Sequence, residues 1–157
     1  MQYGNMQYGG MPMKWYKFLI YFGLFASAFS YFVMGIMYLT GGIYSSQGVN
    51  AEWVYRFAGS SLKTIDMLYG VACFALCAYS IVVRQKLANL QVGAPKALNT
   101  FYIVNGGATV VYCLLFMAVY TSTDQITSQI VSAILGMAIS IAINNAYFSK
   151  RAHLFTR

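Results

Sequence analysis

The sequence predicts an all-α fold, a bundle of four transmembrane helices that run up, down, up and down. Of the 157 residues, 59% are hydrophobic and 8% are charged, whereas about 25% are charged in an average soluble domain. Four runs with almost no charge are long enough to cross a bilayer, which takes about 20 helical residues. The basic residues lie between these runs, as loop charges do. These observations identify the lipid bilayer as the protein's surroundings.

The four spans are predicted at residues 18–39, 62–83, 97–120 and 126–148. The first contains 22 residues without a charge, which is longer than the apolar core of a signal peptide. The second must begin near Leu62, because the run that ends at Arg84 is otherwise too short to span. Pro95 suits the first turn of the third helix. Only residues 121–123 separate the last two spans, so these helices are expected to be antiparallel neighbours.

Lysine and arginine residues predict the orientation. Eight of the ten lie on one side of the four-span arrangement, namely Lys14, Lys17, Arg84, Lys86, Lys96, Lys150, Arg151 and Arg157. Two, Arg56 and Lys63, lie on the other side. Basic residues accumulate in cytoplasmic loops, so both termini are expected in the cytoplasm.

Two segments outside the spans have a distinct character. Residues 1–12 contain MQYG twice and little that can pack, which predicts a disordered cytoplasmic tail before a transmembrane domain at 13–157. In the loop between the first two spans, Asn50 is a good N-cap for a short helix that carries Trp53 and Phe57 on one face. We expect this helix to lie on the membrane surface.

Asp66 is the one carboxylate near a span, in the first turns of the second helix. A negative charge is favourable at a helix N-terminus, and Lys63 is one turn away. We therefore interpret Asp66 as a charge on the outer face. The alternative is a role at the entrance of a transport path, because acids buried in membranes are usually functional.

Two further sets of residues are predicted to join helices. The first is a helix-packing seam of small residues that are spaced four apart along each helix. It consists of Gly23 and Ser27 in the first span and of Ser132, Gly136 and Ser140 in the fourth. Such seams let helix backbones approach closely, either within the bundle or between subunits.

The second set is a polar cluster of Asn105, Asn144 and Asn145. Counting inward from Phe101 and Phe148 gives Asn105 and Asn144 the same depth, so we expect these two to hydrogen bond, with Asn145 turned elsewhere. The alternative is a polar lining for a cavity that opens to the cytoplasm.

No catalytic, cofactor or metal site is predicted. The cysteines Cys73, Cys77 and Cys113 lie in apolar runs without the Cys-x-x-Cys spacing, and the one histidine, His153, lies outside the spans. The sequence contains no phosphate-binding glycine loop and no HExxH motif. Because the basic residues do not share a polar face, nucleic-acid binding is not expected either.

Three segments resemble a family of small, uncharacterised four-span membrane proteins of Firmicutes bacteria. They are MKWYKFLIYF from Met13, KTIDMLYG from Lys63 and NAYFSKRAHLF from Asn145. The resemblance implies a bacterial plasma membrane and no particular activity.

We therefore expect a non-enzymatic membrane protein. The leading interpretation is an accessory or scaffold subunit that binds other membrane proteins or itself. The alternative is a small transporter or channel subunit that acts as an oligomer, because four helices fill their own interior with side chains.

Overall fold

The computed structural model describes residues 14–119 and 124–156. The first transmembrane helix is continuous and consists of α1 (Lys14–Phe18), the π-helical segment η1 (Leu19–Gly23) and α2 (Leu24–Thr40). It begins four residues before the predicted span because a helix does not have to stop where the apolar run stops. The predicted tail at 1–12 and the turn at 121–123 lie outside the described residues.

The other transmembrane helices are α5 (Ser60–Ala88), α6 (Ala94–Val119) and α7 (Asp124–Ser149). All four helices are long and apolar enough to cross a membrane, which confirms the predicted four-helix fold. The main difference from the prediction is the length of α5, which continues to Ala88 past Arg84. A charge ends the part of a helix that can face lipid, but the backbone hydrogen bonds continue beyond it.

Two short helices fill the connection between α2 and α5. They are α3 (Gly42–Ser45) and α4 (Ala51–Ala58). The side chain of Asn50 caps α4 by accepting a hydrogen bond from the backbone N–H of Glu52 at 2.8 Å, so the predicted short helix is confirmed. We call residues 42–58 the cap.

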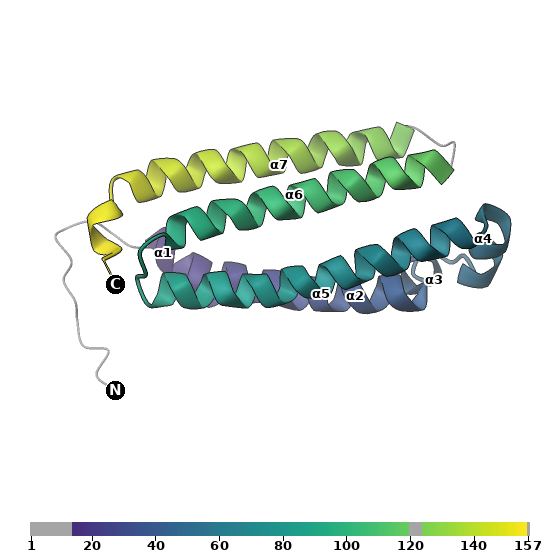
Figure 1. Cartoon of the computed structure of the whole chain (residues 1–157), viewed down its shortest axis with the longest axis horizontal. Helices are drawn as coiled ribbons and strands as arrows, with labels where there is room; N and C mark the ends of the chain where they lie inside the picture. Colours follow the sequence, from purple (N-terminus) through teal and green to yellow (C-terminus); the bar gives the residue numbers. More distant parts are fainter. Residues whose placement is uncertain (1–13, 120–123, 157) are drawn as a thin grey trace.

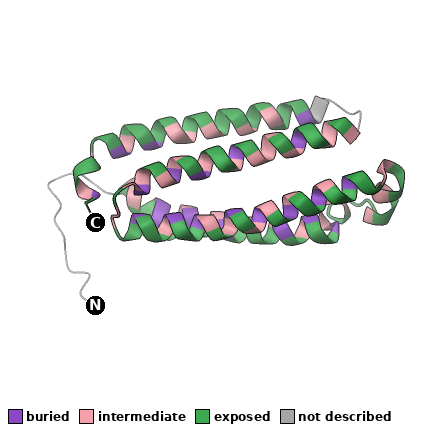
Figure 2. Ribbon diagram, in the orientation of Figure 1, coloured by how far each residue is buried: buried purple, intermediate pink, exposed green. Residues whose placement is uncertain are grey.

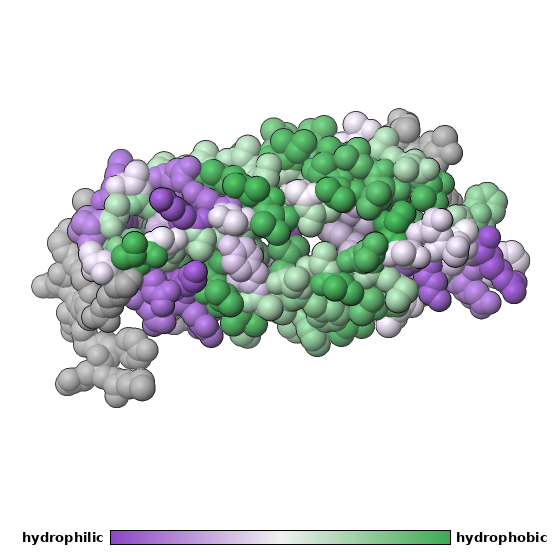
Figure 3. Space-filling view, viewed as in Figure 1, coloured by the Kyte–Doolittle hydropathy of each residue, from purple (hydrophilic) through white to green (hydrophobic). Residues whose placement is uncertain are grey.

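The helices form two antiparallel pairs, α2 with α5 and α6 with α7, which are joined because α5 also packs on α6 (Figure 1). The predicted antiparallel contact of the last two helices is confirmed. Helix α1 and the 3₁₀ turn η2 (Ala152–Leu154) lie at one end, called here the termini end, and the cap lies at the other, the cap end. Hydrophobic residues cover the middle of the surface, and hydrophilic residues gather at both ends (Figure 3).

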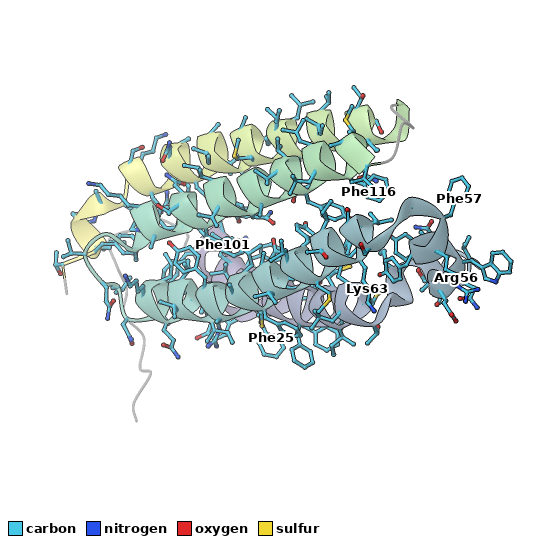
Figure 4. The ribbon with its side chains drawn as sticks, turned by 45° about the vertical axis from the view of Figure 1, so that its right-hand side comes forward. Phe25, Arg56, Phe57, Lys63, Phe101 and Phe116 are labelled. Atoms are coloured by element: carbon cyan, nitrogen blue, oxygen red, sulfur yellow. The ribbon has the colours of Figure 1, made fainter. Side chains whose placement is uncertain are left out.

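The apolar core is concentrated at the termini end. Phe101 is one of its largest fully buried side chains and points from α6 into the space between the helix pairs (Figure 4). The buried members of this core are Leu19, Ile20, Leu24, Leu76, Val83, Leu87, Ala94, Leu98, Phe101, Phe148 and Phe155. They come from every transmembrane helix and from the segment after α7, so all four helices are held together at this end.

Glycine allows the closest approach of two helices, between α2 and α5. A Cβ atom on Gly70 would lie 3.2 Å from the carbonyl oxygen of Gly35, and one on Gly35 would lie 3.0 Å from the Phe74 ring. Any larger residue at either position would push the helices apart. The α6–α7 pair has a counterpart in Gly106, where a Cβ would lie 2.9 Å from the sulfur of the flexible Met137 side chain.

Candidate functional site

The main polar site of the protein surrounds the carboxylate of Asp66. Its Oδ2 atom accepts hydrogen bonds from the hydroxyls of Tyr44 and Tyr55, at 2.7 and 3.1 Å. Its Oδ1 atom accepts one from the hydroxyl of Tyr112 at 3.0 Å. Three phenol hydroxyls can satisfy an ionised carboxylate, which only accepts hydrogen bonds.

The three donors come from three different elements, namely α3, α4 and α6, while Asp66 belongs to α5. Asp66 is the seventh residue of α5, which places it about 9 Å from the first residue of that helix at 1.5 Å per residue. Its exposed fraction is 0%. One side chain therefore connects the cap to two transmembrane helices from a fully buried position.

Aromatic rings pack beneath the carboxylate, on the side toward the middle of the membrane helices. The rings of Tyr69 and Tyr112 stack with centroids 4.3 Å apart, and Tyr38 packs edge-on against both. The hydroxyl of Tyr69 lies 3.3 Å from that of Thr109 on α6. We call Tyr38, Tyr44, Tyr55, Tyr69 and Tyr112 the tyrosine cluster.

The interpretation of Asp66 as a surface charge is wrong. Lys63 is exposed, and the ion pair found among the described residues joins Glu52 to Arg56 on the outside of the cap. Asp66 is stabilised by neutral phenols instead of a cation. The sequence offers one signal for this site, which is the number of tyrosines on either side of Asp66, but no period relates Tyr44, Tyr55 and Tyr112 to one another.

The two cap tyrosines differ from ordinary phenols. Burial, together with the negative charge of Asp66, raises the pKa of Tyr55 to about 12. Burial and the hydrogen bond to Asp66 raise the pKa of Tyr44 further above its usual value. Both therefore remain protonated donors across the physiological range of pH. The charge at this site is carried by the carboxylate of Asp66, and the single substitution Asp66→Asn removes it.

A second polar group lies at the termini end. Asn144 of α7 is buried, and its Oδ1 accepts a hydrogen bond from the indole N–H of Trp15 at 3.3 Å. The hydroxyl of Tyr16 donates to the carbonyl of Leu87 at 2.7 Å. In the same region, Arg84 donates to the carbonyl of Ile20 at 2.9 Å, inside the π-helical segment. These bonds tie α1 and η1 to α5 and α7.

The expected pairing of Asn105 with Asn144 is wrong. Asn145 reaches α6, where its side-chain oxygen accepts a hydrogen bond from Asn99 at 2.6 Å. Together with the contact of Gly106 with Met137, this fixes the register, so that Asn105 lies about six residues, or roughly 9 Å, from the level of Asn144. Counting from Phe101 and Phe148 failed because these two residues do not lie at the same level: in this register Phe148 is level with residues 95 and 96 of α6.

The predicted seam of small residues does not bring two helices of this chain together at its two glycines, Gly23 and Gly136. A Cβ on Gly136 would meet nothing within 4 Å, and one on Gly23 would contact only residues of its own helix. Ser132 is exposed, Ser140 is half-buried, and Ser27 donates back to the carbonyl of Gly23. Of the two alternatives for Gly136, packing within the bundle is excluded, and packing between subunits stays a prediction.

The remaining reactive residues form no recognisable site. Cys73 and Cys113 are buried, Cys77 is half-buried, and all three are free thiols. Among the described residues, no three His, Cys, Asp or Glu side chains come together in a way that suits a metal ion. The tyrosine cluster around Asp66 is therefore the site with the most distinctive chemistry.

Comparison with protein-family models, with curated proteins and with solved structures finds no match.

Proposed function

We propose that the protein is a non-enzymatic scaffold or accessory subunit of a bacterial plasma membrane, with both termini in the cytoplasm, and that it binds another membrane protein or a second copy of itself through α7. The eight-to-two distribution of basic residues supports this orientation. No partner is needed to complete the termini-end core, so association would use surface that the fold leaves open.

The observation that carries the proposal is the open surface of α7. In the most apolar stretch of α5, 28% of residues are buried, whereas the corresponding figure for α7 is 6%. In Figure 2, exposed residues recur along α7 between half-buried ones. Helix α7 packs along α6 and meets α1 through Asn144 near its C-terminal end.

The exposed side of α7 also carries Ser132 and Gly136, one turn apart. Lipid tails are as apolar as leucine side chains, so helices in membranes associate through close backbone packing and polar contacts, which small residues permit. Ser132 and Gly136 therefore supply a position on the open surface where the backbone of a second helix can approach closely, beside the exposed aliphatic side chains of α7.

Cysteine cross-linking in native membranes tests the proposal. Gly136→Cys should give a cross-linked product under mild oxidation or with a thiol-reactive photo-cross-linker. Ala138→Cys is the matched control, because it is also small and exposed, lies at nearly the same depth, and points about 200° away around the helix. The unmodified chain controls for the three native cysteines. Equal products at both positions, or none at Gly136→Cys, would contradict the proposal.

A small transporter or channel subunit is the second candidate, and the burial of Asp66 favours it. Ionisable residues buried among membrane helices often belong to ion or proton pathways. However, Asp66 lies near one end of α5 and its oxygens are occupied by three phenols. We therefore expect no proton movement in vesicles that contain the protein and a pH-sensitive dye. A flux that disappears in Asp66→Asn would favour the transporter over the scaffold.

A further inference from the structure

The cap has no hydrophobic core of its own. Neither α3 nor α4 contains a buried residue, and the side chains of Trp53 and Phe57 on α4 are 72% and 86% exposed. Figure 4 shows Phe57 and Arg56 pointing away from the membrane helices. Segments with few buried contacts open locally at low free-energy cost. Within the protein itself, the attachment of the cap depends on a small number of specific contacts.

Two of those contacts are the hydrogen bonds from Tyr44 and Tyr55 to the carboxylate of Asp66, at 2.7 and 3.1 Å. The two tyrosine rings also pack edge-on with centroids 5.5 Å apart, so they enter the site as a unit. Hydrogen bonds to a charged group are about twice as strong as those between neutral groups. The charge on Asp66 thus contributes directly to holding the cap in place.

Glycines flank the cap on both sides. Gly41 has φ +72° and Gly59 has φ +85°, values that residues with a side chain rarely adopt. A Cβ on Gly41 would lie 2.7 Å from that of Ala51, so the closed cap rests against this glycine. Gly59 has nothing within 4 Å of its Cβ position. The chain can therefore change direction at either end of the cap without moving α2 or α5.

We propose that the cap is a lid over the part of the tyrosine cluster that belongs to the transmembrane helices, Tyr38, Tyr69 and Tyr112, held closed by the ionised carboxylate of Asp66 and able to open at Gly41 and Gly59. The groups that face Asp66 are Tyr38 from α2, Tyr44 from α3, Tyr55 from α4 and Tyr112 from α6, with Lys63 exposed one turn back on its own helix. None of them is a buried cation. Neutralising Asp66 leaves the lid without its charged acceptor, and the carboxyl group becomes accessible from the cap end.

Amide hydrogen exchange of the full-length protein in lipid nanodiscs, read by mass spectrometry, tests the lid. The variant Tyr44→Phe, Tyr55→Phe removes the two donors of the cap and keeps the charge. We expect exchange in peptides from residues 42–58 to become about 10-fold faster or more, the factor expected for a loss of about 1.4 kcal/mol in one charge-assisted bond. Asp66→Asn should have an effect in the same direction.

Tyr112→Phe is the matched control, because it removes an identical hydroxyl from the same carboxylate but belongs to α6. It should leave exchange in the cap unchanged. Glu52→Gln controls for the loss of an acid that lies on the cap itself. Unchanged exchange in the double tyrosine variant would overturn the proposal. An equal acceleration in Tyr112→Phe would also overturn it, since Asp66 would then stabilise this end as a whole instead of closing a lid.

Discussion

The two ends of the molecule are stabilised by different interactions. The termini end has a large apolar core drawn from all four helices, and its hydrogen bonds, such as those from Trp15 to Asn144 and from Arg84 to the carbonyl of Ile20, surround that core. The cap end has little buried apolar surface in its outer layer and depends on the charged side chain of Asp66. Stability at the termini end should therefore respond to side-chain volume, and stability at the cap end should respond to charge.

The largest expected effect tests the volume dependence. Phe101 is 1% exposed and contacts the rings of Tyr31 and Tyr79. Phe101→Ala should lower the free energy of unfolding in detergent by about 3 to 5 kcal/mol, because it leaves a cavity in the core. Hydrogen exchange in the cap should not change. A loss below 1 kcal/mol would show that the core collapses around the cavity or that it contributes little to the free energy of unfolding.

Asp66→Asn tests the charge dependence. The amide is similar in size to the carboxylate but accepts hydrogen bonds less strongly, so we expect a loss of about 2 kcal/mol in the same unfolding measurement. Phe25→Ala is the control, since the Phe25 ring points away from the bundle and should contribute little (Figure 4). If Asp66→Asn stabilised the protein, the free-energy cost of burying the charge would exceed the gain from its hydrogen bonds. The charge of Asp66 would then not be what stabilises the cap end.

A smaller effect separates the asparagines. Asn144→Ala removes the hydrogen bond to Trp15 and should cost about 1 kcal/mol, whereas Asn105→Ala should cost less than half of that. Because the two residues do not meet, the double variant should show additive losses within about 0.5 kcal/mol. A clear coupling energy between them would show that the α6–α7 register differs from the one set by Asn99 and Asn145.

The smallest expected effect concerns alkaline pH. The folded-state pKa of Tyr55 is raised to about 12, above the ordinary value of about 10. Its contribution to stability is therefore fully present below pH 10 and is lost as the pH rises through 12. Tyrosinate absorbance should show one transition near pH 12 that is missing in Tyr55→Phe. The same transition should shift to lower pH in Asp66→Asn, and an unshifted transition would mean that the Asp66 charge does not act on Tyr55.

Length and hydropathy were enough to predict the four helices and their order, because spanning a bilayer imposes both. The capped helix at Ala51–Ala58 was also predictable, since an N-cap asparagine is a local signal. The burial of Asp66 was not, because it results from a loop folding back over its own helix. Nothing in the spacing of Tyr44 and Tyr55 shows that their hydroxyls converge on one carboxylate.

The polar and small residues inside the membrane were predicted less well for a related reason. Their depth depends on helix register, and Phe101 and Phe148, from which the depths were counted, lie about six residues apart in that register. The glycines that bring helices together, Gly35 and Gly70, do not belong to a repeated row. A spacing of four shows that residues share one side of a helix, but it does not show which neighbour that side meets.

The order of contacts along the chain has a consequence for biosynthesis. The α2–α5 pair is contiguous in sequence apart from the cap, so it can form while α6 and α7 are still being translated. The contacts made at the termini end by Asn144, Phe148 and Phe155 need residues that are translated after α1, α2, α5 and α6. Until then α7 has no attachment to α1. The termini end therefore closes after the α2–α5 pair, and a partner of the kind proposed above would meet α7 before that closure.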